Sequence, residues 1–133
     1  RIRLASDPAV QNLLVYGAGL RFRAFRRELV RSTGRNRRII VGILDDDPAL
    51  RGRRVAGIPV VGSLADAESA VRDLSVDAVV IACQQDSARR EVAVRLFRRL
   101  GLVVTLWSCE ETVLAFAPPP PASSSTPNSK KKE

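Results

Sequence analysis

Two glycines near the start of the chain are the first residues whose spacing could support chemistry. Gly17 and Gly19 stand between a short apolar run at 12–16, NLLVY, and a stretch with helical periodicity. A glycine turn that joins a buried strand to a helix lets backbone N–H groups and the helix N-terminus face a phosphate. Gly17 would permit the tight turn, and Gly19 would let a pyrophosphate approach the backbone. The sequence therefore predicts a phosphate-binding turn that consists of Gly17, Ala18, Gly19 and Leu20.

An acidic cluster follows the next apolar run. Asp45 stands directly after the run at 38–44, where a carboxylate can accept hydrogen bonds from the hydroxyls of a ribose. Asp46 and Asp47 precede Pro48, and we interpret them as a solvated turn. Of the three acids, Asp45 is thus the predicted ligand-binding residue.

The far end of the ligand would lie near Ala82, Cys83 and Gln84, which end or follow the apolar run at 77–83. A single apolar thiol at a strand end is more often a small buried hydrophobe than a nucleophile. We therefore interpret these three residues as contacts rather than as catalytic groups.

Phe22 stands where the G-x-G-x-x-G pattern of dinucleotide-binding proteins has its third glycine. A phenyl ring there must push the helix outward or turn across the phosphate site. Two interpretations stay open. In the first the turn binds a nucleotide or dinucleotide, and in the second the glycines serve the fold alone and the pocket is vestigial.

The composition excludes several kinds of catalytic site. The chain has no histidine and two cysteines, so it cannot supply the four ligands of a structural zinc site or the base of a Ser-His-Asp triad. No lysine precedes position 130, so Tyr16 cannot belong to a Tyr-x-x-x-Lys centre. No acid, base and nucleophile form a set, and we expect a binding domain rather than a complete enzyme. Two cysteines without a disulfide framework favour a reducing, cytoplasmic setting.

Apolar runs and helical patterns alternate along the chain. Runs without polar alternation are typical of strands that helices cover on both faces. We therefore predict an α/β fold: a Rossmann-like, doubly wound, mainly parallel five-stranded sheet with the first strand central. The predicted strands are 12–16, 38–44, 58–61, 77–83 and 102–107.

The helices between these strands have recognisable starts and apolar faces. Ser63 with Asp66 forms a capping box, and Ser87 is a second cap. Apolar positions recur at helical spacing, and we expect these to face inward: Phe22, Phe25, Leu29 and Val30 in the first helix, and Val92, Leu96, Phe97 and Leu100 in the last.

Three segments are expected along the chain: a lead-in at 1–11 that joins an upstream region, the Rossmann-like domain at 12–117, and a disordered Pro/Ser/Lys tail at 118–133. The formal net charge is +8, and arginines are spread over two helices and their loops. The phenylalanines fall on inward helical positions, so no stacking platform for bases is expected. Nucleic acid is therefore a disfavoured partner, although an anion- or nucleic-acid-binding regulator stays open as an alternative.

Three blocks carry a resemblance to a known family. NLLVYGAG at 12–19, GILDDDPALRGRRVAGIPVVGSL at 42–64 and VDAVVIACQ at 76–84 resemble the Rossmann-type domain of bacterial polysaccharide-biosynthesis proteins. That family includes membrane-anchored nucleotide-sugar epimerases/dehydratases and polyprenyl-phosphate sugar-phosphate transferases.

The resemblance implies an accessory domain that binds NAD, NADP or a nucleotide-sugar. It also implies a cytoplasmic place at the inner face of the cell membrane, with any membrane contact made by upstream segments of the parent protein. Gly17, Gly19 and Asp45 match the family pattern, whereas Phe22 departs from it and leaves the occupancy by a cofactor open. The vestigial-pocket alternative instead implies a homo-oligomer or another protein partner.

Overall fold

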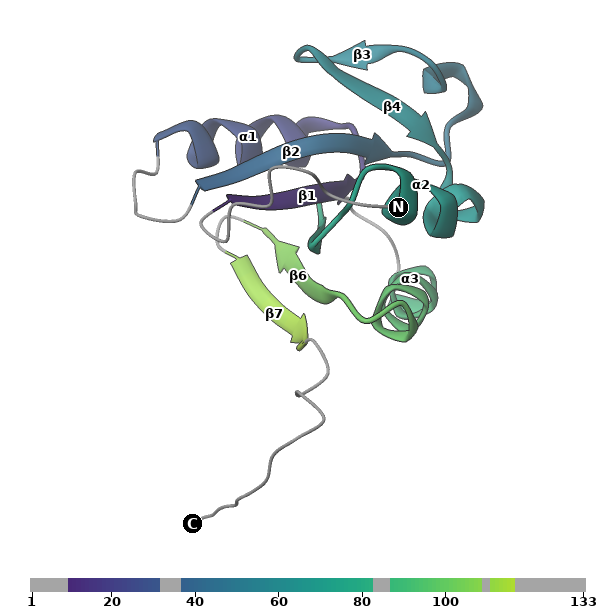
Figure 1. Cartoon of the computed structure of the whole chain (residues 1–133). Helices are drawn as coiled ribbons and strands as arrows, with labels where there is room; N and C mark the ends of the chain where they lie inside the picture. Colours follow the sequence, from purple (N-terminus) through teal and green to yellow (C-terminus); the bar gives the residue numbers. More distant parts are fainter. Residues whose placement is uncertain (1–9, 32–36, 83–86, 109–110, 117–133) are drawn as a thin grey trace.

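The computed structural model describes residues 10–31, 37–82, 87–108 and 111–116 (Figure 1). Within these ranges, seven strands form one sheet, and three α-helices and two short 3₁₀ helices connect them. In chain order the elements are β1 (Val10–Tyr16), α1 (Leu20–Arg31), β2 (Arg37–Leu44), η1 (Pro48–Leu50), β3 (Arg54–Val55), β4 (Ile58–Gly62), η2 (Leu64–Asp66), α2 (Ala67–Asp73), β5 (Ala78–Ile81), α3 (Ser87–Arg99), β6 (Val103–Trp107) and β7 (Glu111–Ala115).

The strand order is β3-β4-β2-β1-β5-β6-β7, with β1 at the centre. The pairs β4–β2, β2–β1, β1–β5 and β5–β6 are all parallel. Five parallel strands in this order form the doubly wound sheet of a Rossmann-like fold. The predicted fold class is therefore confirmed, and all five predicted strands are present within two residues of their expected bounds.

Two strands were not predicted. β3 is a two-residue strand antiparallel to β4, and β7 is antiparallel to β6 at the opposite edge of the sheet. β1 begins at Val10, so Val10 and Gln11 of the expected lead-in at 1–11 pair with β2. Residues 1–9 of that lead-in and the predicted tail at 118–133 lie outside the described residues.

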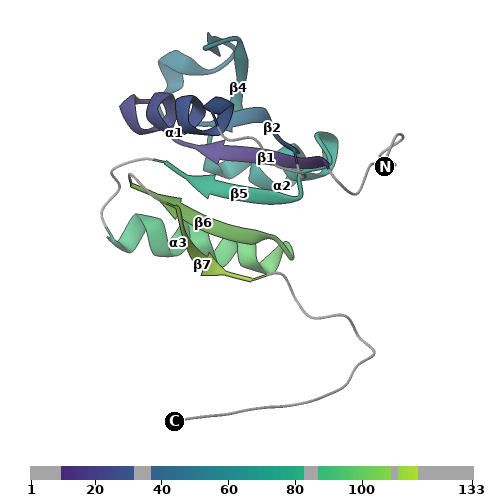
Figure 2. The same cartoon turned by 90° about the vertical axis from the view of Figure 1, so that its left-hand side faces the viewer.

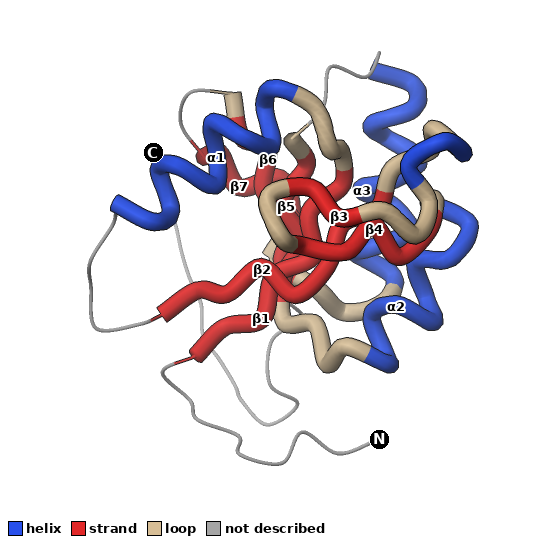
Figure 3. The backbone as a smooth tube through the Cα atoms, turned by 90° about the horizontal axis from the view of Figure 1, so that it is seen from above, coloured by secondary structure: helices blue, strands red, loops and turns tan. Residues whose placement is uncertain are grey.

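Alternate residues of β1 face opposite layers of the molecule. Leu13 and Val15 pack in a cluster with the aromatic side chains of α1, whereas Leu14 and Tyr16 pack in a second cluster with α2 and α3. Figure 2 shows α1 on one side of the sheet and α3 on the other, and Figure 3 shows the same layers from above. The apolar runs lack polar alternation because both faces of the sheet are covered.

The helices bury the expected aromatic residues but not every expected aliphatic one. Phe22 and Phe97 are fully buried. Val30 and Val92 were predicted to face inward, and both predictions were wrong, since their exposed fractions are 67% and 53%. Val30 lies roughly 100° round its helix from the half-buried Leu29, and Val92 lies the same angle from the buried Ala93. Both valines are therefore at the border of the apolar face of their helix. Within the described residues, no helix has the length and apolar character that crossing a membrane requires.

A polar cluster fastens the edge strand β7 to the rest of the sheet. Arg38 of β2 donates two hydrogen bonds to the carboxylate of Glu111, at 2.9 and 2.6 Å, and Thr105 donates a third at 2.7 Å. Burial raises the pKa of Glu111, but the bonds from Arg38 and Thr105 outweigh burial and hold that pKa below its usual value. Three strands separate β2 from β7 in the sheet order, so the contact depends on the twist of the sheet.

Candidate functional site

The glycine turn follows β1 at the carboxyl edge of the sheet. Gly17 has a φ of 117°, a conformation that side-chain-bearing residues rarely adopt. Its N–H donates to the carbonyl of Leu44 at 2.8 Å and so ties the turn to the end of β2. The fold alone therefore explains the glycine at position 17.

Gly19 has no comparable structural reason to be glycine. Its φ lies outside the left-handed region, and a Cβ at this position would meet no atom within 4 Å. Its carbonyl accepts from Arg23 at 3.2 Å, which makes Gly19 the N-cap of α1. Serine, aspartate or asparagine would cap a helix better, because their side chains bond the first free amides. A glycine with open space beside it leaves the helix start accessible to an external anion.

The first amides of α1 have no acceptor within the described part of the chain. The first turn of a helix lacks intrahelical acceptors for its N–H groups, and α1 has no acidic residue in its first turn. No backbone or side-chain acceptor contacts the amides of Leu20, Arg21 or Phe22 in the described residues. Leu20 is also 84% exposed, so the start of the helix is open to solvent.

Phe22 does not cover this turn. Its ring is fully buried and packs in the cluster under α1 with Leu13, Val15 and Phe25. The ring fills the core between helix and sheet, where a third glycine would allow closer packing. Since the space beside Gly19 is open, the phenyl ring does not fill the predicted phosphate position.

Asp45 lies against the glycine turn, as the sequence predicted. Its Oδ2 accepts from the amide of Ala18 at 2.8 Å, and its Oδ1 accepts from the amide of Asp47 at 2.9 Å. Each carboxylate oxygen can accept a second hydrogen bond. The half-buried Asp45 is therefore held in place and keeps acceptor capacity for ligand hydroxyls.

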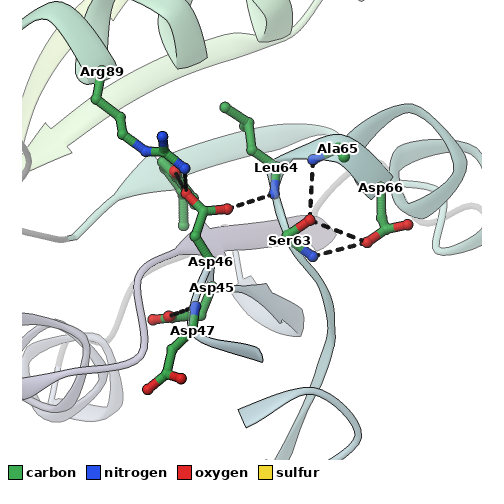
Figure 4. Close-up of polar contacts among 9 residues, drawn as sticks. Asp45, Asp46, Asp47, Ser63, Leu64, Ala65, Asp66 and Arg89 are labelled. Carbon is green, nitrogen blue, oxygen red and sulfur yellow. Dashed lines mark hydrogen bonds and ion pairs between the residues drawn. The ribbon is translucent and has the colours of Figure 1, made fainter. Parts of the chain in front are cut away.

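Asp46 is not part of a solvated turn, which corrects the interpretation from the sequence. Its Oδ2 accepts from the hydroxyl of Tyr16 and from the guanidinium of Arg89, and its Oδ1 accepts from the amide of Leu64 at 2.9 Å. These partners come from β1, α3 and η2, so Asp46 joins three elements at the carboxyl edge (Figure 4).

The protonation of this cluster follows from its contacts. Burial raises the pKa of Asp46, but the hydrogen bonds from Arg89, Leu64 and Tyr16 together hold it below the usual value. Burial, together with the bond to Asp46, raises the pKa of Tyr16. The cluster is thus an ionised carboxylate between a cation and a neutral phenol, which suits a structural role.

Asp47 and the segment after β4 cap the two short 3₁₀ helices at the carboxyl edge of the sheet. Asp47 is exposed and caps η1 by accepting from the amide of Ala49 at 3.0 Å. The predicted capping box of Ser63 and Asp66 is present. Asp66 also accepts a hydrogen bond from Arg51 at 2.9 Å. This bond is the largest cause of the lowered pKa of Asp66.

The remaining predicted contacts divide into two groups. Ala82 is fully buried, and its amide donates to the carbonyl of Tyr16 at 2.9 Å. Its side chain therefore belongs to the core. Cys83 and Gln84 lie outside the described residues. The structure thus brings together Gly17, Ala18, Gly19 and Asp45 of the predicted site.

Sequence reasoning missed the joint role of Tyr16, Asp46 and Arg89. Tyr16 ends one apolar run and Asp46 follows the next, on strands that were expected to be neighbours. Their proximity could therefore have been predicted from the sequence. Arg89 resembled the other arginines of its helix until the fold placed it against Asp46. Among the described residues, no three potential ligand side chains gather to hold a metal ion.

Solved structures share this architecture. UDP-D-quinovosamine 4-dehydrogenase from Vibrio fischeri gives a TM-score of 0.65 at 16% identity, covering 74% of this chain and 78% of that one. RSP, a Rex-family repressor in complex with beta-NADH, gives 0.62 at 17% identity, covering 83% of this chain and 50% of that one. RSP with beta-NAD+ and operator DNA gives 0.56 at 18% identity, covering 76% and 46% respectively. The chain spans about half the length of the repressor, and at these identities the likeness shows the fold.

Family membership rests on the sequence. No curated protein matches the chain. A known domain family does match residues 9–106, which run from the start of β1 almost to the end of β6 and include the glycine turn and Asp45. By this match the chain belongs to the family described as CoA-binding domain.

Proposed function

We propose that this chain is a nucleotide-binding domain that holds a nucleoside diphosphate group at the carboxyl edge of its sheet. The phosphates contact the turn at Gly17–Leu20, and the ribose hydroxyls bond to Asp45. The observation that carries the proposal is Gly19: an N-cap glycine with open space beside it, in front of amides that have no acceptor in the described residues. An anion at this place would satisfy those amides and the positive end of the helix.

The family and the structural neighbours support a nucleotide of this kind. CoA, NAD(P) and a UDP-sugar all contain a nucleoside diphosphate, although they differ in the groups attached to it. The family is described as CoA-binding, one neighbour is a UDP-sugar dehydrogenase, and another was solved with beta-NADH. In this proposal the glycine turn contacts the shared diphosphate, and Asp45 contacts the ribose.

The finer proposal concerns the protein in which the domain works. We infer a non-catalytic accessory domain of a cell-envelope polysaccharide biosynthesis protein, located in the cytoplasm at the inner face of the membrane. The three sequence blocks that resemble this family support the inference, and so does the fold shared with a dehydrogenase that acts on a UDP-sugar.

Titration calorimetry with CoA, NAD(H), NADP(H) and UDP-sugars tests the proposal. We expect at least one of these ligands to bind, and Gly19→Val to weaken that ligand about tenfold or more, because the new side chain occupies the phosphate position. The variant should still fold, since a Cβ at position 19 meets no atom within 4 Å. Ala88→Val also places a valine at an exposed helix start, and it should leave the affinity unchanged.

A second pair of variants tests the ribose contact. Asp45→Asn should weaken the same ligand by about tenfold, because a charged acceptor is lost. Asp47→Asn makes the same charge change two residues away, on an exposed side chain, and should have little effect. Absence of binding by every ligand, or equal affinity in wild type and Gly19→Val, would contradict the proposal and favour a vestigial pocket.

A further inference from the structure

A second concave region lies between α3 and the edge strand β7, and none of the residues discussed for the nucleotide site takes part in it. The groove has a volume of about 400 Å³ and is lined by Arg90, Glu91, Val94, Arg95, Arg98 and Leu114. The α3 residues recur at spacings of three and four, so they form one stripe along the helix. The groove thus has an arginine-rich wall and an apolar floor.

The charges of this wall are not neutralised within the described part of the chain. Among the described residues, the guanidinium groups of Arg90, Arg95 and Arg98 make no ion pair and no hydrogen bond. Three cations against the single Glu91 give the groove a local positive potential. That potential favours an anionic occupant.

The groove also runs beside an exposed strand edge. Among the described strands, β7 is the outermost at this end of the sheet and pairs with β6 alone. Its neighbouring side chains Val113 and Leu114 are 46% and 36% exposed. An edge strand presents backbone donors and acceptors to any extended segment that lies alongside it.

We propose that the α3/β7 groove binds an acidic peptide segment of a partner protein in extended conformation. The segment adds as a further strand along β7 through main-chain hydrogen bonds. Every second side chain of the added strand faces the groove, where its carboxylate contacts Arg90, Arg95 or Arg98 and its methylene groups lie against Val94 and Leu114. Strand addition provides affinity through the backbone, and the groove selects the side chains.

Charge and shape select this occupant among others. A second copy of the chain would bring a net charge of +8 to a positive groove. The segment 117–133 of this chain has three lysines, one acid and five prolines, and proline lacks the N–H that a strand ladder needs. A flat anionic membrane would contact the rim of a groove and leave the backbone edge of β7 unused.

Fluorescence anisotropy with a labelled peptide that alternates glutamate and valine tests the proposal. We expect binding that weakens about tenfold or more in the triple variant Arg90→Gln/Arg95→Gln/Arg98→Gln, since three charge-assisted contacts are lost. Circular dichroism should show an unchanged fold, because these side chains make no hydrogen bond or ion pair among the described residues. Hydrogen exchange at residues 111–116 should slow when the peptide binds.

The matched control places the same charge change on another surface. Arg23→Gln/Arg27→Gln/Arg31→Gln removes three exposed arginines from α1, on the opposite face of the sheet. This variant should change the affinity less than about twofold, because only the long-range potential is altered. Equal weakening by both triple variants would overturn the proposal in favour of non-specific charge attraction.

A modified peptide and three alternative occupants separate the remaining outcomes. A peptide N-methylated at alternate residues should lose about tenfold or more in affinity, because its edge can no longer pair with β7. Equal binding of that peptide would overturn strand addition. The same arginines are also tested with phosphatidylglycerol vesicles, with duplex DNA and for concentration-dependent dimerisation. If the peptide does not bind, and one of these interactions occurs and is abolished by the triple variant of α3, the proposal is overturned. Nucleotide affinity is also measured in the triple variant of α3 and should not change, so failure of this proposal is distinct from failure of the proposed nucleotide site.

Discussion

Two arginines next to each other on α3 show the difference between two regions of the molecule. Arg89 bonds to Asp46 at the carboxyl edge of the sheet, where a second acid, Asp66, pairs with Arg51. Arg90 faces the α3/β7 groove, where the arginines have no acid partner among the described residues. Cations at the first region therefore hold elements of the fold together, whereas those at the second are available to a partner.

This contrast explains why a net charge of +8 says little about function on its own. The carboxyl edge offers an anion mainly backbone amides, and its own acids already occupy the side-chain cations. The groove offers side-chain cations without internal competition. Removal of a charged side chain that is paired within the fold should lower stability. Removal of one that has no partner among the described residues should affect only binding.

The largest effect is expected at Asp46. Replacement by alanine removes the carboxylate that accepts from the hydroxyl of the buried Tyr16 and from Arg89. We expect a loss of about 1–3 kcal/mol in the free energy of unfolding, because the Tyr16 hydroxyl loses its acceptor, measured by urea denaturation. The neighbouring Asp47→Ala removes only the cap of η1 and should cost about 0.5–1 kcal/mol. Equal losses at the two positions would remove the distinction between a structural acid and a surface acid.

A smaller effect is expected at the Arg38–Glu111 pair. Glu111→Gln keeps the shape of the side chain but removes the charge that faces Arg38, and should cost about 1–2 kcal/mol. The exposed Glu28 provides the control, and Glu28→Gln should change stability by less than about 0.5 kcal/mol. Faster hydrogen exchange at 111–115 in the Glu111 variant would show that the pair fastens β7. Unchanged exchange would contradict that role.

Acidification should act on the same two carboxylates. The pKa values of Asp46 and Glu111 are lower in the folded chain than their usual values, so the folded state binds fewer protons than the unfolded state in this range. Their contribution to stability is then complete above about pH 5 and is lost as the pH falls through about 4 toward the lowered values. Urea midpoints at pH 6 and pH 3 measure this loss. The double variant Asp46→Asn/Glu111→Gln should show a flatter dependence, and an equally steep one would contradict the assignment.

The smallest effect on stability is expected in the groove. Arg90→Gln/Arg95→Gln/Arg98→Gln should change the free energy of unfolding by less than about 0.5 kcal/mol, because exposed charges without partners contribute little. Denaturation in low and high salt measures the change. A loss comparable with that of Asp46→Ala would show that these arginines serve the fold after all.

The sequence was sufficient where a local pattern determined the outcome. Apolar runs at 12–16 and 38–44 and the capping box at Ser63 predicted elements that the structure contains. The glycine turn and Asp45 were placed together because parallel strands end at one edge of the sheet. Local patterns of this kind carry most of the Rossmann-like architecture.

The sequence was insufficient where the outcome depended on partners far along the chain. Asp46 has the local pattern of a turn, but its donors Tyr16 and Arg89 lie 30 and 43 residues away. β7 has a polar start and few residues, and it exists because β6 provides a ladder for it. In the same way, Val30 and Val92 could be placed inside or outside only by the angle at which their helices dock.

The antiparallel direction of β7 determines how the domain can be joined to other segments. β1 starts at the edge of the sheet opposite the glycine turn, and β7, which runs against its neighbour, ends at that same edge. Both covalent connections of the described fold, at Val10 and at Phe116, therefore lie away from Gly19 and Asp45. We expect fusion partners or spin labels attached at either connection to leave access to the proposed nucleotide site unhindered.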